Sequence, residues 1–118
     1  LFNLSMLLNG GRMSESEARV REVLPLVTRM GDRQQTILAV ALLAQIAAGT
    51  GRPKRAGRLW GAIEVEEARA PVGQWETQRD RFAQVILAHT GPEFEFGRAE
   101  GRHLSLDEAV DCALEKVR

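Results

Sequence analysis

Residues 49–62 read Gly-Thr-Gly-Arg-Pro-Lys-Arg-Ala-Gly-Arg-Leu-Trp-Gly-Ala and join two segments of different character. The segment before them, 33–48, is apolar on nearly every face of a helix, which is typical of a helix buried between neighbours. Pro53 suits the first position of the next helix, because its missing amide hydrogen would have no partner there. That helix carries Leu59 and Trp60 on one face. The stretch therefore predicts the elbow of a helical hairpin.

The residues upstream of the elbow predict two further helices. Residues 1–9 have the apolar spacing of the end of a helix. The capping box at Ser14–Glu17 predicts that a second helix begins there, and Pro25 predicts a bend in it because proline removes a backbone donor. Asp32 is a capping signal for the helix over 33–48.

The residues downstream of the elbow also predict only helices. Residues 70–73, Ala-Pro-Val-Gly, end the helix that follows the elbow. A fifth helix is expected over about 74–89 and a short one over 93–100. The capping box at Ser105–Glu108 predicts the start of the last helix. Since no segment alternates between apolar and polar residues as a strand does, the sequence predicts an all-α fold.

Composition narrows the class of protein. The 118 residues hold 16 Lys plus Arg and 16 Asp plus Glu, so no overall charge attracts nucleic acid or an anionic membrane. The single cysteine, Cys112, cannot form an internal disulfide and fits a reducing compartment. The longest apolar run, 37–48, is shorter than the roughly 20 residues that span a bilayer. We expect a cytoplasmic protein without a signal peptide or membrane span, and the start at Leu1 suggests a piece of a longer chain.

The chain also shows a repeat. The pair Gly11-Arg12 recurs as Gly51-Arg52, each time between an apolar and an amphipathic segment. This recurrence predicts one domain, with helical units at about 1–31 and 32–70 and capping helices over about 73–118. The second unit has large, small, turn and aromatic residues where a tetratricopeptide unit needs them: Leu43, Ala44, Ala47, Gly51, Ala56 and Trp60. We therefore expect a tetratricopeptide-like right-handed helical superhelix.

Several segments together resemble a known family. They are Met30–Arg33, residues 51–62, Phe94 and the ending Ala99–Val110, which reads Ala-Glu-Gly-Arg-His-Leu-Ser-Leu-Asp-Glu-Ala-Val. These segments resemble the C-terminal tetratricopeptide-like region of large bacterial signalling regulators. Such regulators join an ATPase module and a helical repeat arm to an output domain, commonly a LuxR-type DNA-binding domain and sometimes a nucleotidyl cyclase.

Two positions depart from that family. Its members usually carry a tryptophan where Arg98 stands, and a more alanine-rich unit where Gly57 stands. The family's ATP-binding and DNA-binding motifs have no counterpart in this chain. The resemblance thus implies the regulatory arm of such a protein, without its catalytic or DNA-reading parts.

The residues do not predict a chemical site. The side chains that could ligate a metal lack a ligand spacing, so we expect no metal, cofactor or catalytic residue. These side chains are His89, Glu93, Glu95, His103, Asp107, Asp111 and Cys112. The adjacent pair Glu66 and Glu67 is expected to lie on a solvated helix face. Trp60 and Trp75 are expected in the core, and Cys112 is expected to be an inert thiol because no cation adjoins it.

One basic cluster leaves its role open. Arg52, Lys54, Arg55 and Arg58 could contact phosphates, but they lack interleaved aromatic residues and acids follow one or two turns later. We expect no direct nucleic-acid contact from this chain. The sequence alone does not decide whether the cluster binds anything.

The expected function is that of a non-catalytic interaction arm. Stacked hairpins form a concave surface that can hold a protein, a peptide, another domain of the same parent chain or a small effector. The predicted repeat register places four residues on that groove: Leu38, Ala41, Gln45 and Ala48. The alternatives are a stand-alone helical-repeat adaptor, a DNA-binding module in its own right, and a helical enzyme.

Overall fold

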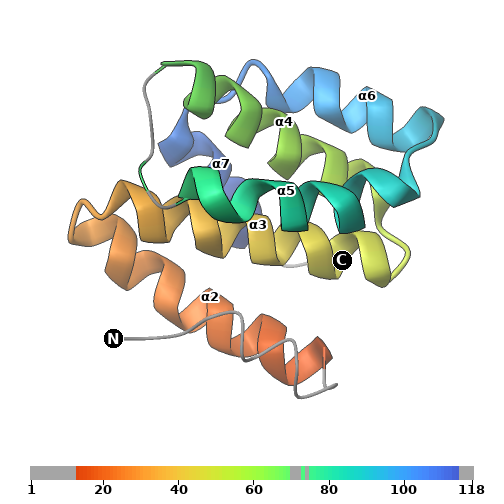
Figure 1. Cartoon of the computed structure of the whole chain (residues 1–118). Coiled ribbons are helices and arrows are strands. Elements are labelled where there is room, and N and C mark those ends of the chain that lie inside the picture. The colour runs from red at the N-terminus through yellow and green to blue at the C-terminus, as the bar shows by residue number, and fades with distance from the viewer. Residues whose placement is uncertain (1–12, 70–72, 74, 115–118) are drawn as a thin grey trace.

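The predicted elbow joins two helices of equal length. In the computed structural model, α3 (Arg33–Gly49) and α4 (Pro53–Arg69) each have 17 residues and pack side by side as a hairpin (Figure 1). The structure describes residues 13–69, 73 and 75–114, so the helix end expected over 1–9 lies outside the described residues.

The helix before this hairpin repeats its geometry. Helix α2 (Met13–Arg29) packs on α3. The two turns are built alike, with left-handed glycines at Gly31 (φ 74°) and Gly51 (φ 76°). In each turn the residue after the glycine donates its amide to the carbonyl of a residue in the last turn of the preceding helix, at 3.0 Å and 2.9 Å. Both turns are therefore the same glycine-ended helix cap.

Two of the three predicted capping signals are confirmed. Asp32 accepts a hydrogen bond from the Gln35 amide at 3.0 Å, as its capping signal predicts, and the box before the last helix is described below. Helix α2 includes residues 13–17, and the side chains of 14–16, which belong to the predicted capping box, lie outside the described atoms. The helix continues across Pro25 to Arg29. A helix therefore covers the predicted box, and the capping role of Ser14 stays a prediction.

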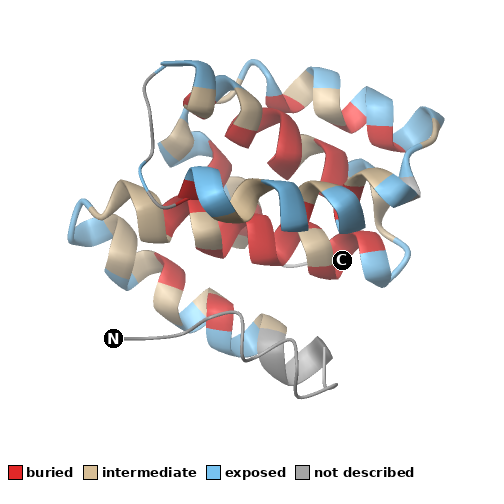
Figure 2. Ribbon diagram, viewed as in Figure 1, coloured by how far each residue is buried: buried red, intermediate tan, exposed pale blue. Residues whose placement is uncertain are grey.

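The core is built around α3. Helices α2, α4, α5 and α7 all pack on it, which explains why it is apolar on nearly every face. Figure 2 shows α3 coloured as buried along most of its length. The largest side chains of the core come from every helix between α2 and α6: Leu24, Ile37, Leu42, Ile46, Leu59, Trp60, Ile63, Trp75, Ile86 and Phe94.

The C-terminal part adds four helical segments. These are α5 (Trp75–Ile86), the short 3-10 helix η1 (Leu87–His89), α6 (Pro92–Gly101) and α7 (Leu106–Leu114). Trp75 stands edge-on to Trp60 at 6.5 Å between ring centres, and both are buried as predicted. The capping box before α7 is confirmed, because the Glu108 amide donates to Ser105 Oγ (3.1 Å) and Glu108 accepts from the Ser105 amide (2.9 Å). The described part of the chain is all helical and contains no strand.

The closest helix pair is α4 with α6. Four glycines, two on each helix, sit where a side chain would collide with the backbone of the other helix. A Cβ at Gly57 would lie closer than 3.0 Å to the Phe94 carbonyl, and one at Gly61 would meet the Arg98 carbonyl in the same way. Gly61 lies one helical turn after Gly57, and its partner Arg98 lies one helical turn after Phe94. The two helices therefore run in the same direction.

The glycines of α6 complete the contact. Gly97 faces the carbonyl of Lys54, and Gly101 faces the carbonyl of Arg58. One α-hydrogen of each glycine therefore points at a carbonyl oxygen across the interface, the arrangement of weak Cα–H···O contacts. The two positions that depart from the resembled family, Gly57 and Arg98, meet in this contact, because a Cβ on Gly57 would lie 2.9 Å from the Arg98 nitrogen. Glycine gives here the close approach that small residues allow between helices.

Candidate interaction surfaces

The predicted groove residues lie along α3 at different depths. Ala41 and Ala48 are buried by the chain's own helices, whereas Leu38 and Gln45 are half-buried. A partner at this position would touch Leu38 and Gln45 first. The assignment of the four residues to a groove stays a prediction.

The residues considered as metal ligands are not gathered by the fold. His103 and Asp107 are exposed near the start of α7, while Glu93 and Glu95 are exposed on α6. Cys112 is half-buried on α7. Within 13–69 and 75–114, no group of three or more His, Cys, Asp or Glu side chains is placed to hold a metal ion. The side chain of His89 is outside the described atoms.

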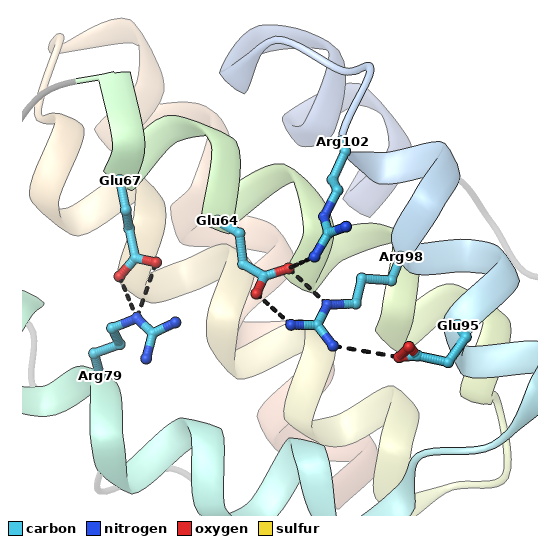
Figure 3. A network of polar contacts seen from close by, with 6 residues as sticks. All are labelled: Glu64, Glu67, Arg79, Glu95, Arg98 and Arg102. Atoms are coloured by element: carbon cyan, nitrogen blue, oxygen red, sulfur yellow. Dashed lines mark hydrogen bonds and ion pairs between the residues drawn. The ribbon is translucent and has the colours of Figure 1, made fainter.

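A polar network links the second half of α4 to α5 and α6 (Figure 3). Arg98 donates to both carboxylate oxygens of Glu64, at 2.7 Å from Nε and 2.5 Å from Nη2, and Arg102 reaches Glu64 at 3.5 Å. The neighbouring Glu67 accepts from Arg79 Nε at 2.9 Å and from the Trp75 indole at 2.8 Å. These contacts link α5 and α6 to α4. The network is called the clasp below, and its residues are Glu64, Glu67, Trp75, Arg79, Arg98 and Arg102.

The clasp lowers the pKa of Glu64. Burial pushes the pKa of Glu64 upward, but hydrogen bonding and charge from Arg98, with the charges of Arg102 and Arg79, outweigh it and bring the pKa below 4.5. The unfolded chain therefore binds a proton more readily at this site than the folded chain does.

Stability is expected to fall as the pH drops below about 4.5, in part because Glu64 becomes protonated. A lowered folded-state pKa means that this contribution is present above the unfolded pKa and is lost as pH falls through the folded pKa. Urea unfolding between pH 3 and 6 checks it. Glu64→Gln should flatten the dependence, whereas Glu93→Gln, which removes a carboxylate in no described ion pair, should not. Equal slopes for the two variants would contradict the assignment.

A second ion cluster is buried at Glu66. Its side chain is 5% exposed and accepts from Arg33 Nε at 2.5 Å and from Arg69 Nη2 at 2.6 Å. Arg33 also donates to the Glu66 backbone carbonyl at 2.7 Å. Hydrogen bonding from Arg69 lowers the pKa of Glu66, burial opposes that shift, and Arg33 adds to it. The expectation that Glu66 lies on a solvated face is therefore wrong, because two guanidinium groups offset the cost of burying its charge.

This cluster borders a cleft of about 360 Å³ between the end of α2, the start of α3, the end of α4 and the start of α7. Arg33, Glu66 and Arg69 line it with Val65 and Asp107. The charges of the lining residues balance, so the cleft selects neither cations nor anions.

A smaller cleft of about 290 Å³ lies at the elbow itself. Its charged lining is Arg52, Lys54, Arg55, Arg58 and Glu93, four cations against one carboxylate. The whole basic cluster singled out by the sequence thus gathers around one hollow.

The environment of Cys112 differs from the expected one. Its sulfur lies 3.7 Å from Arg58 Nη1, so a cation does adjoin this thiol. The hydrogen bond with Cys112, together with that of Glu100, raises the pKa of Arg58 against the effect of burial. The contact comes from α4, 54 residues away in sequence, and neighbouring residues in the sequence could not reveal it.

Comparisons with known proteins add no assignment. No protein-family model, curated protein or solved structure matches this chain. Among the helices that the structure describes, none is long and apolar enough to cross a bilayer.

Sequence reasoning missed two features of these surfaces. The burial of Glu66 depends on Arg33, which stands 33 residues earlier. No local sequence pattern could therefore indicate that Glu66 is buried. The glycines of α4 and α6 did leave a signal, since Gly57 and Gly61, like Gly97 and Gly101, stand one helical turn apart on one face. That spacing could have predicted a close helix contact.

Proposed function

We propose that this chain is a non-catalytic interaction arm of a bacterial transcriptional regulator of the LuxR-associated kind. In this proposal the arm works in the cytoplasm and couples a partner or effector to an ATPase and an output domain elsewhere in the parent chain. The observation that carries it is the regular succession of α2, α3 and α4, three 17-residue helices joined by two turns of the same build. Regular helical hairpins of this kind build extended surfaces that bind other molecules.

The later helices support the same reading. Helix α5 packs on α3, and α6 packs on α4 in the same direction. Stacking of later helices on the helices of an earlier hairpin is how a tetratricopeptide-like superhelix grows. Helix α7 packs on α2, α3 and α4, which suits a helix that closes the end of the stack.

The mechanism proposed for the arm is a shift between two states of the parent protein. A partner in the groove of α3 would contact the half-buried Leu38 and Gln45. It changes the output only if it binds one state of the protein better than the other. A partner with equal affinity for both states would leave the output unchanged.

The test uses the full-length parent protein, whose coding sequence is read first on both sides of residues 1–118. An ATPase and an output domain in the same frame support the regulator, whereas helical repeats alone make the chain a free-standing adaptor. A photoreactive residue is then placed at Gln45 or, as control, at exposed Ala99 on α6. We expect a crosslink from position 45 to one partner or one other domain, and none from position 99.

Two results would contradict the interaction arm. One is the same set of crosslinks from both positions. The other is tight, salt-dependent binding of duplex DNA by the 118-residue chain, which would favour the DNA-binding module instead.

A further inference from the structure

We propose that the elbow cleft lined by Arg52, Lys54, Arg55 and Arg58 binds a small phosphate-bearing molecule, with pyrophosphate as its simplest representative. This site is separate from the groove of α3 and does not depend on the regulatory role proposed above. It assigns a ligand class to the basic cluster that the sequence left undecided.

The first support is the shape and place of the cleft. It has a volume of about 290 Å³ and is formed by the α3–α4 turn, the first two turns of α4 and Glu93 at the start of α6. Its size lies at the lower end of small-molecule sites. The cleft is confined to one turn and the ends of two helices, so it suits a compact anion better than a long nucleic-acid strand.

The second support is the balance of charge at the site. Arg52 reaches Glu17 at 3.4 Å, and Arg58 pairs with Glu100 at 3.0 Å. Lys54 contacts the ring of exposed Phe96, at 4.8 Å from its centre, and forms no ion pair with any described carboxylate. The lining of the cleft itself holds four cations and one carboxylate, Glu93.

Arg55 connects the cleft to α7. Its guanidinium donates to the Ala113 carbonyl at 2.7 Å and is half-buried between α4 and α7. Burial lowers the pKa of Arg55, and the nearby charges of Arg21 and Arg52 lower it further, although Glu17 and Cys112 act the other way. The guanidinium group of Arg55 is thus held in a partly buried position close to the charges of two other arginines.

The start of α4 also favours a bound anion. The first turn of α4 holds no acidic residue, although the start of a helix is stabilised by negative charge. The guanidinium groups of Arg52, Arg55 and Arg58 can hydrogen-bond phosphate oxygens, and Lys54 adds a mobile point charge. A phosphate group would place negative charge at the helix start and offer acceptor oxygens to the cations of the lining.

The test titrates sodium pyrophosphate into the 118-residue chain at constant ionic strength, followed by amide NMR and calorimetry. We expect saturable one-to-one binding with shifts at Gly51–Arg55. Lys54→Gln should weaken binding about tenfold, because it removes a charge-assisted contact. This side chain is exposed, so the variant should keep its fold, which thermal unfolding verifies. Arg81→Gln is the matched control, because it removes an exposed cation of α5. This variant should bind pyrophosphate as the parent chain does.

Three outcomes would overturn the proposal. The first is a linear, unsaturated response to pyrophosphate. The second is equal weakening by Lys54→Gln and Arg81→Gln, which would reduce the effect to overall charge. The third is displacement of pyrophosphate by duplex DNA with a steep salt dependence, which would make the surface a nucleic-acid contact. Failure of pyrophosphate binding would leave the crosslinking test at Gln45 unaffected, so the two proposals fail separately.

Discussion

Replacing Gly97 with serine is expected to lower the free energy of unfolding by about 2–3 kcal/mol. The new Cβ would overlap the Lys54 carbonyl of α4, and a backbone group cannot rotate aside as a side chain can. Serine gains less than about 1 kcal/mol over glycine from helix propensity, so the collision outweighs the gain. Urea unfolding measures the change directly, and a fall of roughly 10 °C in Tm should accompany it.

The matched control is Gly91→Ser at the start of the same helix. Gly91 has extended backbone (φ 179°), and a Cβ there meets nothing within 4 Å. Serine is also a favourable residue before a helix, so this variant should be as stable as the parent or slightly more stable. Gly97→Ser with unchanged stability would show that α4 and α6 are not in backbone contact.

Glu66→Gln is expected to cost about 2 kcal/mol of stability. The substitution keeps the shape of the side chain but leaves the guanidinium of Arg33 without its buried counter-charge. The cost stays below that of a fully buried pair, because the side chains of Arg33 and Arg69 are 26% and 65% exposed and water can solvate them. Equilibrium unfolding at pH 7 measures the loss.

The same substitution at Glu95 provides the comparison. Glu95 is 53% exposed and lies 3.3 Å from Arg98, whose main partner is Glu64. Glu95→Gln should therefore change stability by less than about 0.5 kcal/mol. If the two glutamine variants were equally stable, the Glu66 cluster would not contribute to the fold.

Local signals predicted the helices of this chain well. The apolar run of α3, Pro53 at the start of α4 and the caps at Asp32 and Ser105 each act within a few residues, and each is confirmed.

Contacts between distant segments could not be predicted in the same way. Arg33 with Glu66 and Arg58 with Cys112 come together only after the helices pack. The basic residues at the elbow were visible as a cluster, but the carboxylates one or two turns later were expected to balance them. In the fold, Glu64 instead pairs with Arg98 and Glu67 with Arg79, away from the elbow.

The two similar turns that join α2 to α3 and α3 to α4 have a consequence for how such a chain can change its length. Each helix with its turn reverses the direction in which the chain travels. Inserting or deleting one such helix and turn would invert every later helix and separate the glycines that join α4 to α6. Inserting or deleting two helices with their turns would restore the direction of the later helices. Lengthening by duplication should therefore add an even number of helices.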